Sequence, residues 1–91
     1  MSIPVHRNGD SRTCGASTIV AGQHFVYANG RLISVDGDPD SHGAGSLNAK
    51  CRNVFINGKM IVNVGDSAAP DMAPHSNPAA ASGSPNVFVG D

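Results

Sequence analysis

The stretch VFINGKMIVNV, residues 54–64, decides the fold of this chain. Apolar and β-branched residues stand on both sides of Asn57-Gly58. Asn-Gly is the strongest short signal for a two-residue type I′ turn, because both of its residues tolerate a positive φ. The stretch therefore predicts a β-hairpin. The same pattern occurs earlier in the chain, around Asn29-Gly30.

These hairpin signals belong to a longer repeat, which evenly spaced Gly-Asp pairs mark at residues 9–10, 37–38 and 65–66. Each pair is interpreted as a turn in which the Asp carboxylate accepts local backbone N–H bonds. A third hairpin-like stretch, residues 86–90, fits the register if five residues are inserted after Asp66. One hairpin cannot bury both of its faces, so three should pack around a common axis. The sequence predicts one mostly β domain over residues 1–91, built from three approximate repeats with pseudo-threefold symmetry.

The composition limits what such a domain can do. The chain has 91 residues, of which 40% are apolar and only 4% aromatic, so its core is thin and needs a staple or a partner. A net charge of −1 excludes a basic nucleic-acid surface and an acidic tail. No apolar run approaches the roughly 18 residues that span a bilayer. The first residues lack an apolar segment, so we expect synthesis in the cytoplasm without a signal peptide.

The repeat places three metal-ligand residue types at equivalent positions. Cys14 and His42 each follow a Gly-Asp pair by four residues, and His75 takes the third place once the insertion is counted. Each of the three also precedes a valine of its hairpin by the same number of positions. Equivalent loops around one axis would bring a thiolate and two imidazoles together, which are the donors of a structural zinc site. The sequence thus predicts a metal site of Cys14, His42 and His75.

A closed zinc site needs a fourth ligand, and two candidates remain. Cys51 and His24 occupy neighbouring places in the repeat. Cys51 is slightly preferred because a thiolate is the softer donor, and His24 is the alternative. These ligand types favour zinc and leave iron as an alternative. His6 falls outside the pattern and is interpreted as structural or exposed.

No catalytic constellation competes with the metal site. A thiolate bound to a metal is quenched as a nucleophile, and the chain has no second domain with which to shape a substrate cleft. We therefore expect no enzymatic activity. A thiol-dependent redox or hydrolytic enzyme built on Cys14 is the weaker alternative.

With the repeat and its ligands in view, the chain resembles the PAAR-repeat family, the sharpened tips of contractile injection machines. Residues 4–10, PVHRNGD, are similar to the family's Pro-Ala-Ala-Arg-x-Gly-Asp. Residues 83–87, GSPNV, match its Gly-Ser-Pro-x-Val, and residues 54–58, VFING, look like its Val-Leu-Ile-Asn-Gly. The resemblance covers essentially the whole chain, although only the first repeat keeps both the Pro and the Arg.

The resemblance implies a short cone with a metal near its apex, bound by mixed His and Cys ligands that match Cys14, His42 and His75. Its blunt base would dock on the end of a trimeric β-helical spike, of the phage central-spike or VgrG kind, with one tip per trimer. Such a protein sharpens the spike for membrane piercing and touches the target envelope transiently. It would sit at the tip of a phage tail baseplate in the virion, or at the secreted tip of a type VI secretion system. Apolar residues beyond those needed for the small core could supply the base, and alternation leaves open which of them face inward: Phe25, Tyr27, Phe55, Met60, Ile61 and Phe88. The alternative function is a free-standing zinc-binding protein-interaction adaptor.

Overall fold

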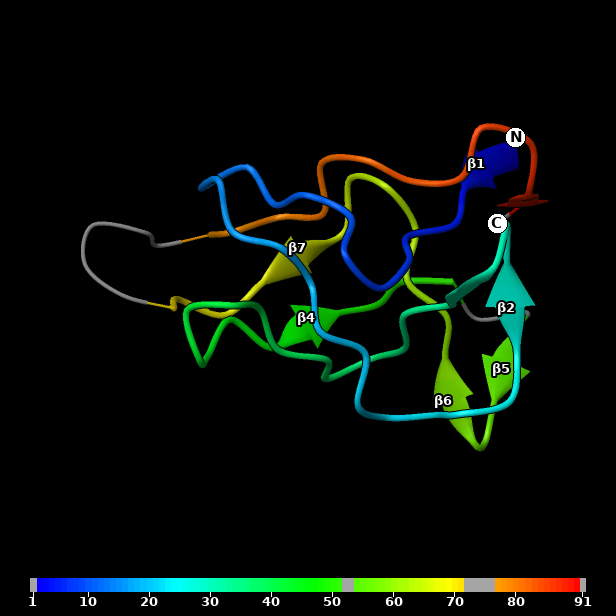
Figure 1. Cartoon of the computed structure of the whole chain (residues 1–91), viewed down its shortest axis with the longest axis horizontal. Helices are drawn as coiled ribbons and strands as arrows, with labels where there is room; N and C mark the ends of the chain where they lie inside the picture. The colour runs from blue at the N-terminus through cyan, green and yellow to red at the C-terminus, as the bar shows by residue number, and fades with distance from the viewer. Residues whose placement is uncertain (1, 52–53, 72–76, 91) are drawn as a thin grey trace.

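The structure, a computed structural model, describes residues 2–51, 54–71 and 77–90. Its regular elements are short strands that pair in four two-stranded antiparallel sheets (Figure 1). The pairs are β1 (Ser2–Pro4) with β8 (Phe88–Gly90), β2 (Tyr27–Ala28) with β3 (Arg31–Leu32), β4 (Leu47–Asn48) with β7 (Ser67–Ala68), and β5 (Phe55–Ile56) with β6 (Lys59–Met60). No helix that could cross a membrane occurs among the described residues. The mostly β class predicted from the sequence is confirmed.

Two of the sheets are the hairpins that the Asn-Gly pairs predict. Asn29 and Asn57 have φ values of 57° and 55°, and the glycines that follow them have φ values of 79° and 78°. Positive φ at both central residues is the mark of a type I′ turn. Ala28 therefore pairs with Arg31, and Ile56 pairs with Lys59.

The sheet of β1 and β8 has the same register as these hairpins, but the two ends of the chain form it. Phe88 pairs with Pro4, as Tyr27 pairs with Leu32 and Phe55 with Met60. The last strand of the chain thus finds its partner in the first. Residues at opposite ends of the sequence complete the third strand pair.

A closed ring of backbone hydrogen bonds lies in the middle of the molecule. His6 N donates to Val62 O, Val62 N donates to Ser34 O, and Ser34 N donates to His6 O, each at 2.9 Å. The three residues are evenly spaced in the sequence and all are fully buried. Three distant segments are therefore tied to one another at equivalent positions.

The Gly-Asp turns have the structure that the sequence predicts. In each turn the Asp carboxylate accepts a hydrogen bond from the backbone N–H three residues earlier, at 2.8–2.9 Å. The donors and acceptors are Arg7 to Asp10, Val35 to Asp38, and Asn63 to Asp66.

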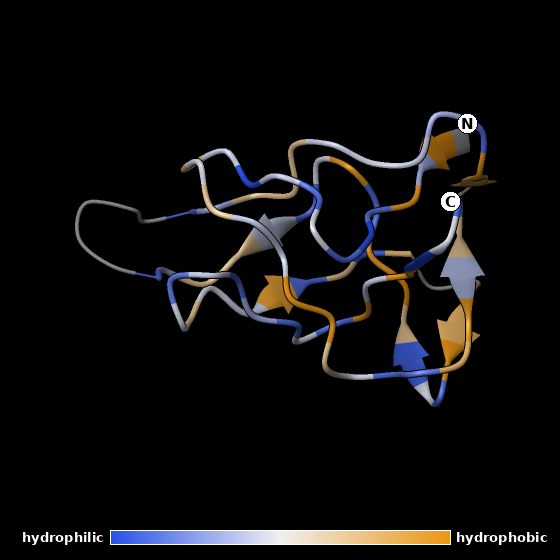
Figure 2. Cartoon of the chain, in the orientation of Figure 1, coloured by the Kyte–Doolittle hydropathy of each residue, from blue (hydrophilic) through white to orange (hydrophobic). Residues whose placement is uncertain are grey.

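The apolar core is divided into two small clusters. One lies among the hairpins and holds Val5, Ala28, Ile33, Cys51 and Ile61. The other lies around β4 and β7 and holds Leu47, Val62, Ala68 and Ala80. Figure 2 shows apolar segments along β5 and just before β2, and again at β4. The burial of Ile61 removes it from the apolar residues that could supply the base.

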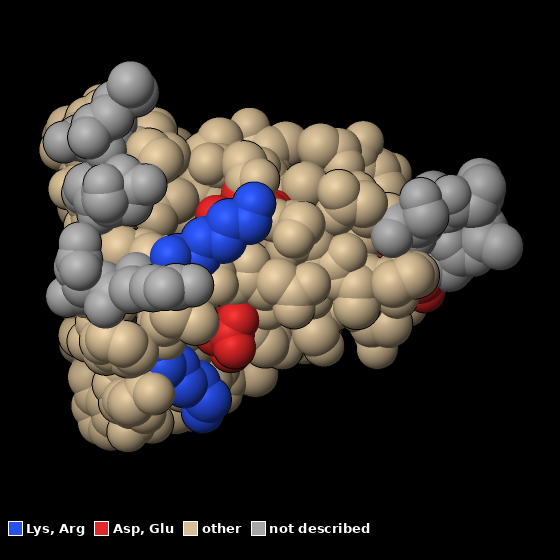
Figure 3. All heavy atoms as spheres, turned by 180° about the vertical axis from the view of Figure 1, so that it is seen from behind, with Lys and Arg blue, Asp and Glu red and all other residues tan. Residues whose placement is uncertain are grey.

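The described residues narrow from one end of the molecule to the other (Figure 3). Strands β1, β2, β5 and β8 gather at the wide end, and the loops around residues 14 and 42 reach toward the narrow end (Figure 1). Basic and acidic side chains lie side by side on the face shown in Figure 3. The hairpins and the loops with candidate ligands therefore occupy opposite ends.

Candidate metal centre

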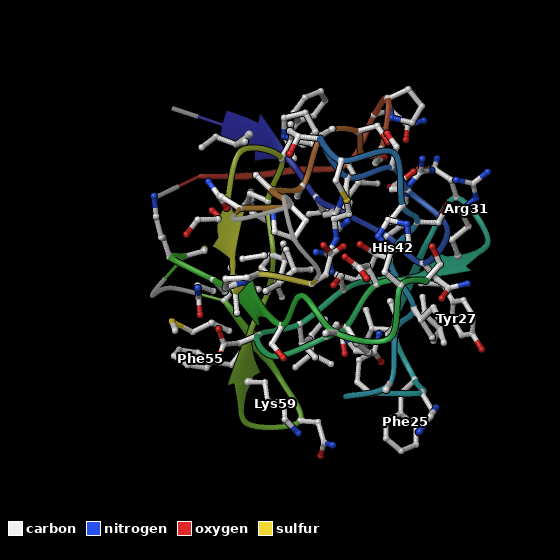
Figure 4. The ribbon with its side chains drawn as sticks, turned by 90° about the vertical axis from the view of Figure 1, so that its left-hand side faces the viewer. Phe25, Tyr27, Arg31, His42, Phe55 and Lys59 are labelled. Carbon is white, nitrogen blue, oxygen red and sulfur yellow. The ribbon has the colours of Figure 1, made fainter. Side chains whose placement is uncertain are left out.

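Four potential ligands converge at the narrow end: Cys14, Asp40, His42 and Asp71. One donor atom from each lies within 4.8 Å of all the others. His42 Nδ1 is 2.8 Å from Asp71 Oδ2 and 4.0 Å from Cys14 Sγ, and Cys14 Sγ is 3.4 Å from Asp71 Oδ2. Figure 4 looks onto this end, with His42 nearer the middle and Phe25 and Phe55 toward the edge. The cluster could hold a metal ion.

The loops that carry Cys14 and His42 are closed by the same two hydrogen bonds. In the first loop Arg12 N donates to Ala16 O at 2.8 Å, and Gly15 N donates to Arg12 O at 3.0 Å. In the second loop Asp40 N donates to Ala44 O at 2.8 Å, and Gly43 N donates to Asp40 O at 3.0 Å. Equal loops place Cys14 and His42 at corresponding points, so the structure brings these two predicted ligands together.

The other predicted ligands have different positions. His75 lies outside the described residues. His24 is exposed beside the β2–β3 hairpin, and Cys51 is buried in the apolar cluster with Val5 and Ile33. Neither His24 nor Cys51 belongs to the cluster of four described residues.

The place of Cys51 in the repeat explains its burial. Its equivalents are Gln23 and Ser84, and both of these close the turn that leads into a hairpin. Gln23 Oε1 accepts the backbone N–H of Phe25 and of residue 26, and Ser84 Oγ accepts those of residues 86 and 87. Cys51, at the equivalent position of the sequence, is buried in the apolar cluster instead of reaching the loops that carry Cys14 and His42.

Two carboxylates that the sequence analysis missed complete the cluster. Asp40 lies two residues before His42 in the same loop, so an acid-x-His spacing was the signal for it. Asp71 lies in the stretch that interrupts the regular period, where alignment of the repeats has no power. The two carboxylates approach closely beside Gly45. A Cβ there would lie 2.5 Å from Asp40 Oδ2 and 3.1 Å from Asp71 Cβ.

The ionisation of the cluster reflects crowded anionic groups. Burial raises the pKa of Asp40, and the neighbouring Asp71 carboxylate raises it further. Burial also raises the pKa of the Cys14 thiol, with a contribution from Asp71 in the same direction. Burial alone would raise the pKa of Asp71, but its interactions with Asp40, His42 and Cys14 outweigh burial and hold that pKa well below its ordinary range. A bound cation would stabilise the anionic form of each of these three groups.

The donor chemistry fits a divalent ion. Asp40 is fully buried, and its Oδ2 has no hydrogen-bond partner among the described residues. A buried polar atom without a partner is costly, whereas a metal ion would satisfy it. One sulfur, one imidazole nitrogen and two carboxylate oxygens are donors that zinc and its neighbours accept.

Comparison with known proteins adds no family to these observations. No protein-family model matches the chain, and no curated protein sequence is a significant match.

Proposed function

We propose that this protein is a non-enzymatic, zinc-stabilised tip that caps the trimeric β-helical spike of a contractile injection machine. The observation that carries the proposal is the ring of three 2.9 Å hydrogen bonds joining His6, Ser34 and Val62. A single chain whose segments meet at three equivalent positions matches the symmetry of a trimer. One such chain can cover the end of three spike chains.

Further bonds around the ring support a pseudo-threefold axis. Three isolated antiparallel bridges join the residue before each ring position to the residue after another ring position: Val5 with Asn63, Arg7 with Ile33, and Val35 with Ile61. The strand pairs β1–β8, β2–β3 and β5–β6 have equivalent registers. On this proposal the molecule is a short cone whose axis passes through the ring.

The wide end has the chemistry of a docking surface. Tyr27, Phe55 and Phe88 occupy equivalent places in the three strand pairs, and they are 58%, 55% and 47% exposed. Phe25, just before Tyr27 in the sequence, is 74% exposed. All four aromatic residues of the chain are thus exposed in the hairpins rather than buried. Exposed apolar patches mark interaction sites, and the end of a β-helix needs a cover for its strand edges.

The cluster at the narrow end would hold the zinc ion. Cys14 and His42 are the ligands that the repeat predicts, His75 remains a predicted ligand, and Asp40 and Asp71 lie within reach. A structural zinc site contributes on the order of 10 kcal/mol of apparent binding energy to a small domain. Such a clamp would resist local unfolding of the apex when the spike is driven into an envelope.

Stoichiometry tests the docking. The purified protein would be mixed with a trimeric β-helical spike fragment, and the mass of the complex measured by light scattering after size-exclusion chromatography. One tip per three spike chains is the expected result. Phe55→Ser should weaken the complex, whereas Ile19→Ser, at an exposed residue outside the hairpins, should not. Failure to bind the spike, with zinc still bound, would favour the free-standing adaptor instead.

A further inference from the structure

Arg12 lies buried beneath the metal centre, with only 2% of its surface exposed. Its Nε donates to Thr18 Oγ1 at 2.6 Å, and its Nη2 donates to Asp38 O at 3.2 Å. Its Nη1 donates both to Gly45 O at 2.9 Å and to Pro78 O at 2.8 Å. Four of the five N–H groups of the guanidinium are thus directed to neutral oxygens in separate segments.

The carboxylate of Asp40 lies beside this guanidinium. Its Oδ2 is 3.6 Å from Arg12 Nη1, and both side chains are fully buried. Because both hydrogens of Nη1 already have acceptors, Arg12 compensates the charge of Asp40 without a hydrogen bond to Oδ2. The other oxygen, Oδ1, accepts the backbone N–H of His42 at 2.9 Å. Oδ2 therefore keeps its lone pairs, and Asp40 offers a carboxylate oxygen within 4.8 Å of ligand atoms of Cys14, His42 and Asp71.

We propose that Arg12 is the positioning residue of the metal centre. Its positive charge compensates the charge of Asp40, and it leaves Oδ2 of Asp40 available to the ion. Asp40 then joins Cys14, His42 and Asp71 as a ligand when the metal binds. This inference rests on the metal binding proposed above. Partners behind the ligands commonly set both the orientation of a ligand and the affinity of the site.

The number and spread of the Arg12 donors explain why this position needs an arginine. Arg12 and Asp40 occupy equivalent positions in the first and second repeats, and there they carry opposite charges. A lysine has three donors on a single nitrogen, so it could not reach Thr18, Gly45 and Pro78 together. Substitution by lysine would keep the positive charge, but the ammonium group would then be free to donate a hydrogen bond to Asp40 Oδ2.

Arg12 also links the cluster to the middle of the fold. Thr18 Oγ1, which accepts from Arg12, lies 2.5 Å from His6 Nε2. The backbone of His6 is part of the ring of three hydrogen bonds. Arg12 and Thr18 thus connect Asp40 with His6 through one ion pair and two hydrogen bonds.

Zinc affinity in a double-mutant cycle tests the role of Arg12. Wild type, Arg12→Lys, Asp40→Asn and the double variant would be titrated with zinc against a chromophoric chelator, and the cobalt spectrum of each recorded. Each single variant should lose about 10- to 100-fold in zinc affinity. The double variant should lose no more than Asp40→Asn, because Arg12 acts through Asp40. His24→Ala, at an exposed histidine outside the cluster, should keep the affinity and spectrum of the wild type.

Three outcomes would overturn the proposal. In the first, Arg12→Lys binds zinc as tightly as the wild type. In the second, Arg12→Lys lowers zinc affinity by the same factor whether residue 40 is Asp or Asn. If Arg12→Lys fails to fold, carbon NMR of the wild type decides, because the Asp40 Cγ resonance must shift when zinc is added. An unshifted Cγ resonance in protein that binds zinc overturns the role of Asp40 and leaves the zinc site standing. A wild type that binds neither zinc nor cobalt contradicts the proposed metal binding itself.

Discussion

His42 Nδ1 and Asp71 Oδ2 lie 2.8 Å apart, although the two residues come from distant parts of the sequence. The same oxygen is 3.4 Å from Cys14 Sγ, so Asp71 is in contact with Cys14 and His42, two of the predicted ligands. The carboxylate thus joins two loops that belong to different repeats. It is therefore the part of the site that sequence alignment of the repeats could not supply.

Replacement of this carboxylate should weaken metal binding. We expect Asp71→Ala to lower zinc affinity at least about tenfold. The substitution removes one ligand, and it also removes the carboxylate that contacts both Cys14 and His42. Competition with a chelator measures the affinity, and elemental analysis measures zinc per chain. Asp36→Asn is the matched control, because it removes a carboxylate outside the cluster. Equal zinc affinity in Asp71→Ala and wild type would show that Asp71 is not a ligand.

Gly45 provides a second test of the same geometry. A Cβ at Gly45 would lie 2.5 Å from Asp40 Oδ2, so Gly45→Ala should displace this carboxylate and weaken zinc binding. Gly43, in the same loop, also has a positive φ of 91°, but no atom lies within 4 Å of a Cβ placed there. Both variants should lose about 1 kcal/mol of stability to backbone strain.

Zinc titration of the two glycine variants separates strain from displacement. Only Gly45→Ala should lose affinity, because only this substitution crowds the carboxylates. If Gly43→Ala loses as much affinity as Gly45→Ala, the strain of the loop, and not the position of Asp40, controls the site.

Local signals account for the parts of the fold that could be predicted. Asn29-Gly30 and Asn57-Gly58 specify hairpins through their own backbone preferences, and both hairpins form. The Gly-Asp turns are equally local, because each carboxylate bonds to a backbone N–H only three residues away. By contrast, the pairing of β4 with β7 joins loops outside the hairpins, and no short pattern indicates it.

The candidate site divides in the same way. Cys14 and His42 meet because two loops of equal length are closed by equal hydrogen bonds, which the regular period of the repeat predicts. Asp71 comes from the inserted stretch, whose path depends on tertiary packing. The softness of a thiolate favours Cys51 as a donor, but softness does not indicate whether the side chain lies in an apolar cluster or in a loop with the other ligands. The donor chemistry of a cysteine therefore does not by itself predict whether the residue is near the other candidate ligands.

The ion pair of Arg7 and Asp10 should be a large contributor to stability. Arg7 Nε and Nη2 donate to the two oxygens of Asp10 at 2.8 and 2.9 Å, and both residues are buried. Burial alone would raise the pKa of Asp10, but the hydrogen bonds from Arg7 outweigh it and lower the pKa. Asp10→Asn should therefore cost about 3–5 kcal/mol, because it leaves the Arg7 charge buried without its partner.

The half-exposed Arg31 offers the control for this ion pair. Arg31 Nη1 lies 3.1 Å from Asp10 Oδ1, but its side chain is 50% exposed. Exposed ion pairs are worth at most about 1 kcal/mol, so Arg31→Ala should change the free energy of unfolding little. Urea unfolding measures both variants. Similar losses for Asp10→Asn and Arg31→Ala would contradict the argument from burial.

His6 should make the protein sensitive to mild acid. Its Nδ1 is 2.7 Å from Ser82 O, which only accepts, so the proton is placed on Nδ1, and Nε2 accepts from the Thr18 hydroxyl. The ring is fully buried and neutral, and burial lowers its pKa, against the smaller opposing effect of the Ser82 hydrogen bond. An unfolded histidine takes up a proton below about pH 6.5, whereas folded His6 does not. The stability from His6 is thus present above about pH 6.5 and is lost as the pH falls toward the folded pKa.

The slope of stability against pH measures this effect. Between about pH 6.5 and 5, the free energy of unfolding of the metal-free protein should fall by up to about 1.4 kcal/mol per pH unit for one proton. Urea unfolding of His6→Gln should show a smaller slope in this window, whatever its absolute stability. His24→Gln is the matched control, because it replaces an exposed histidine outside the cluster in the same way. An unchanged slope in His6→Gln would assign the acid sensitivity to other groups.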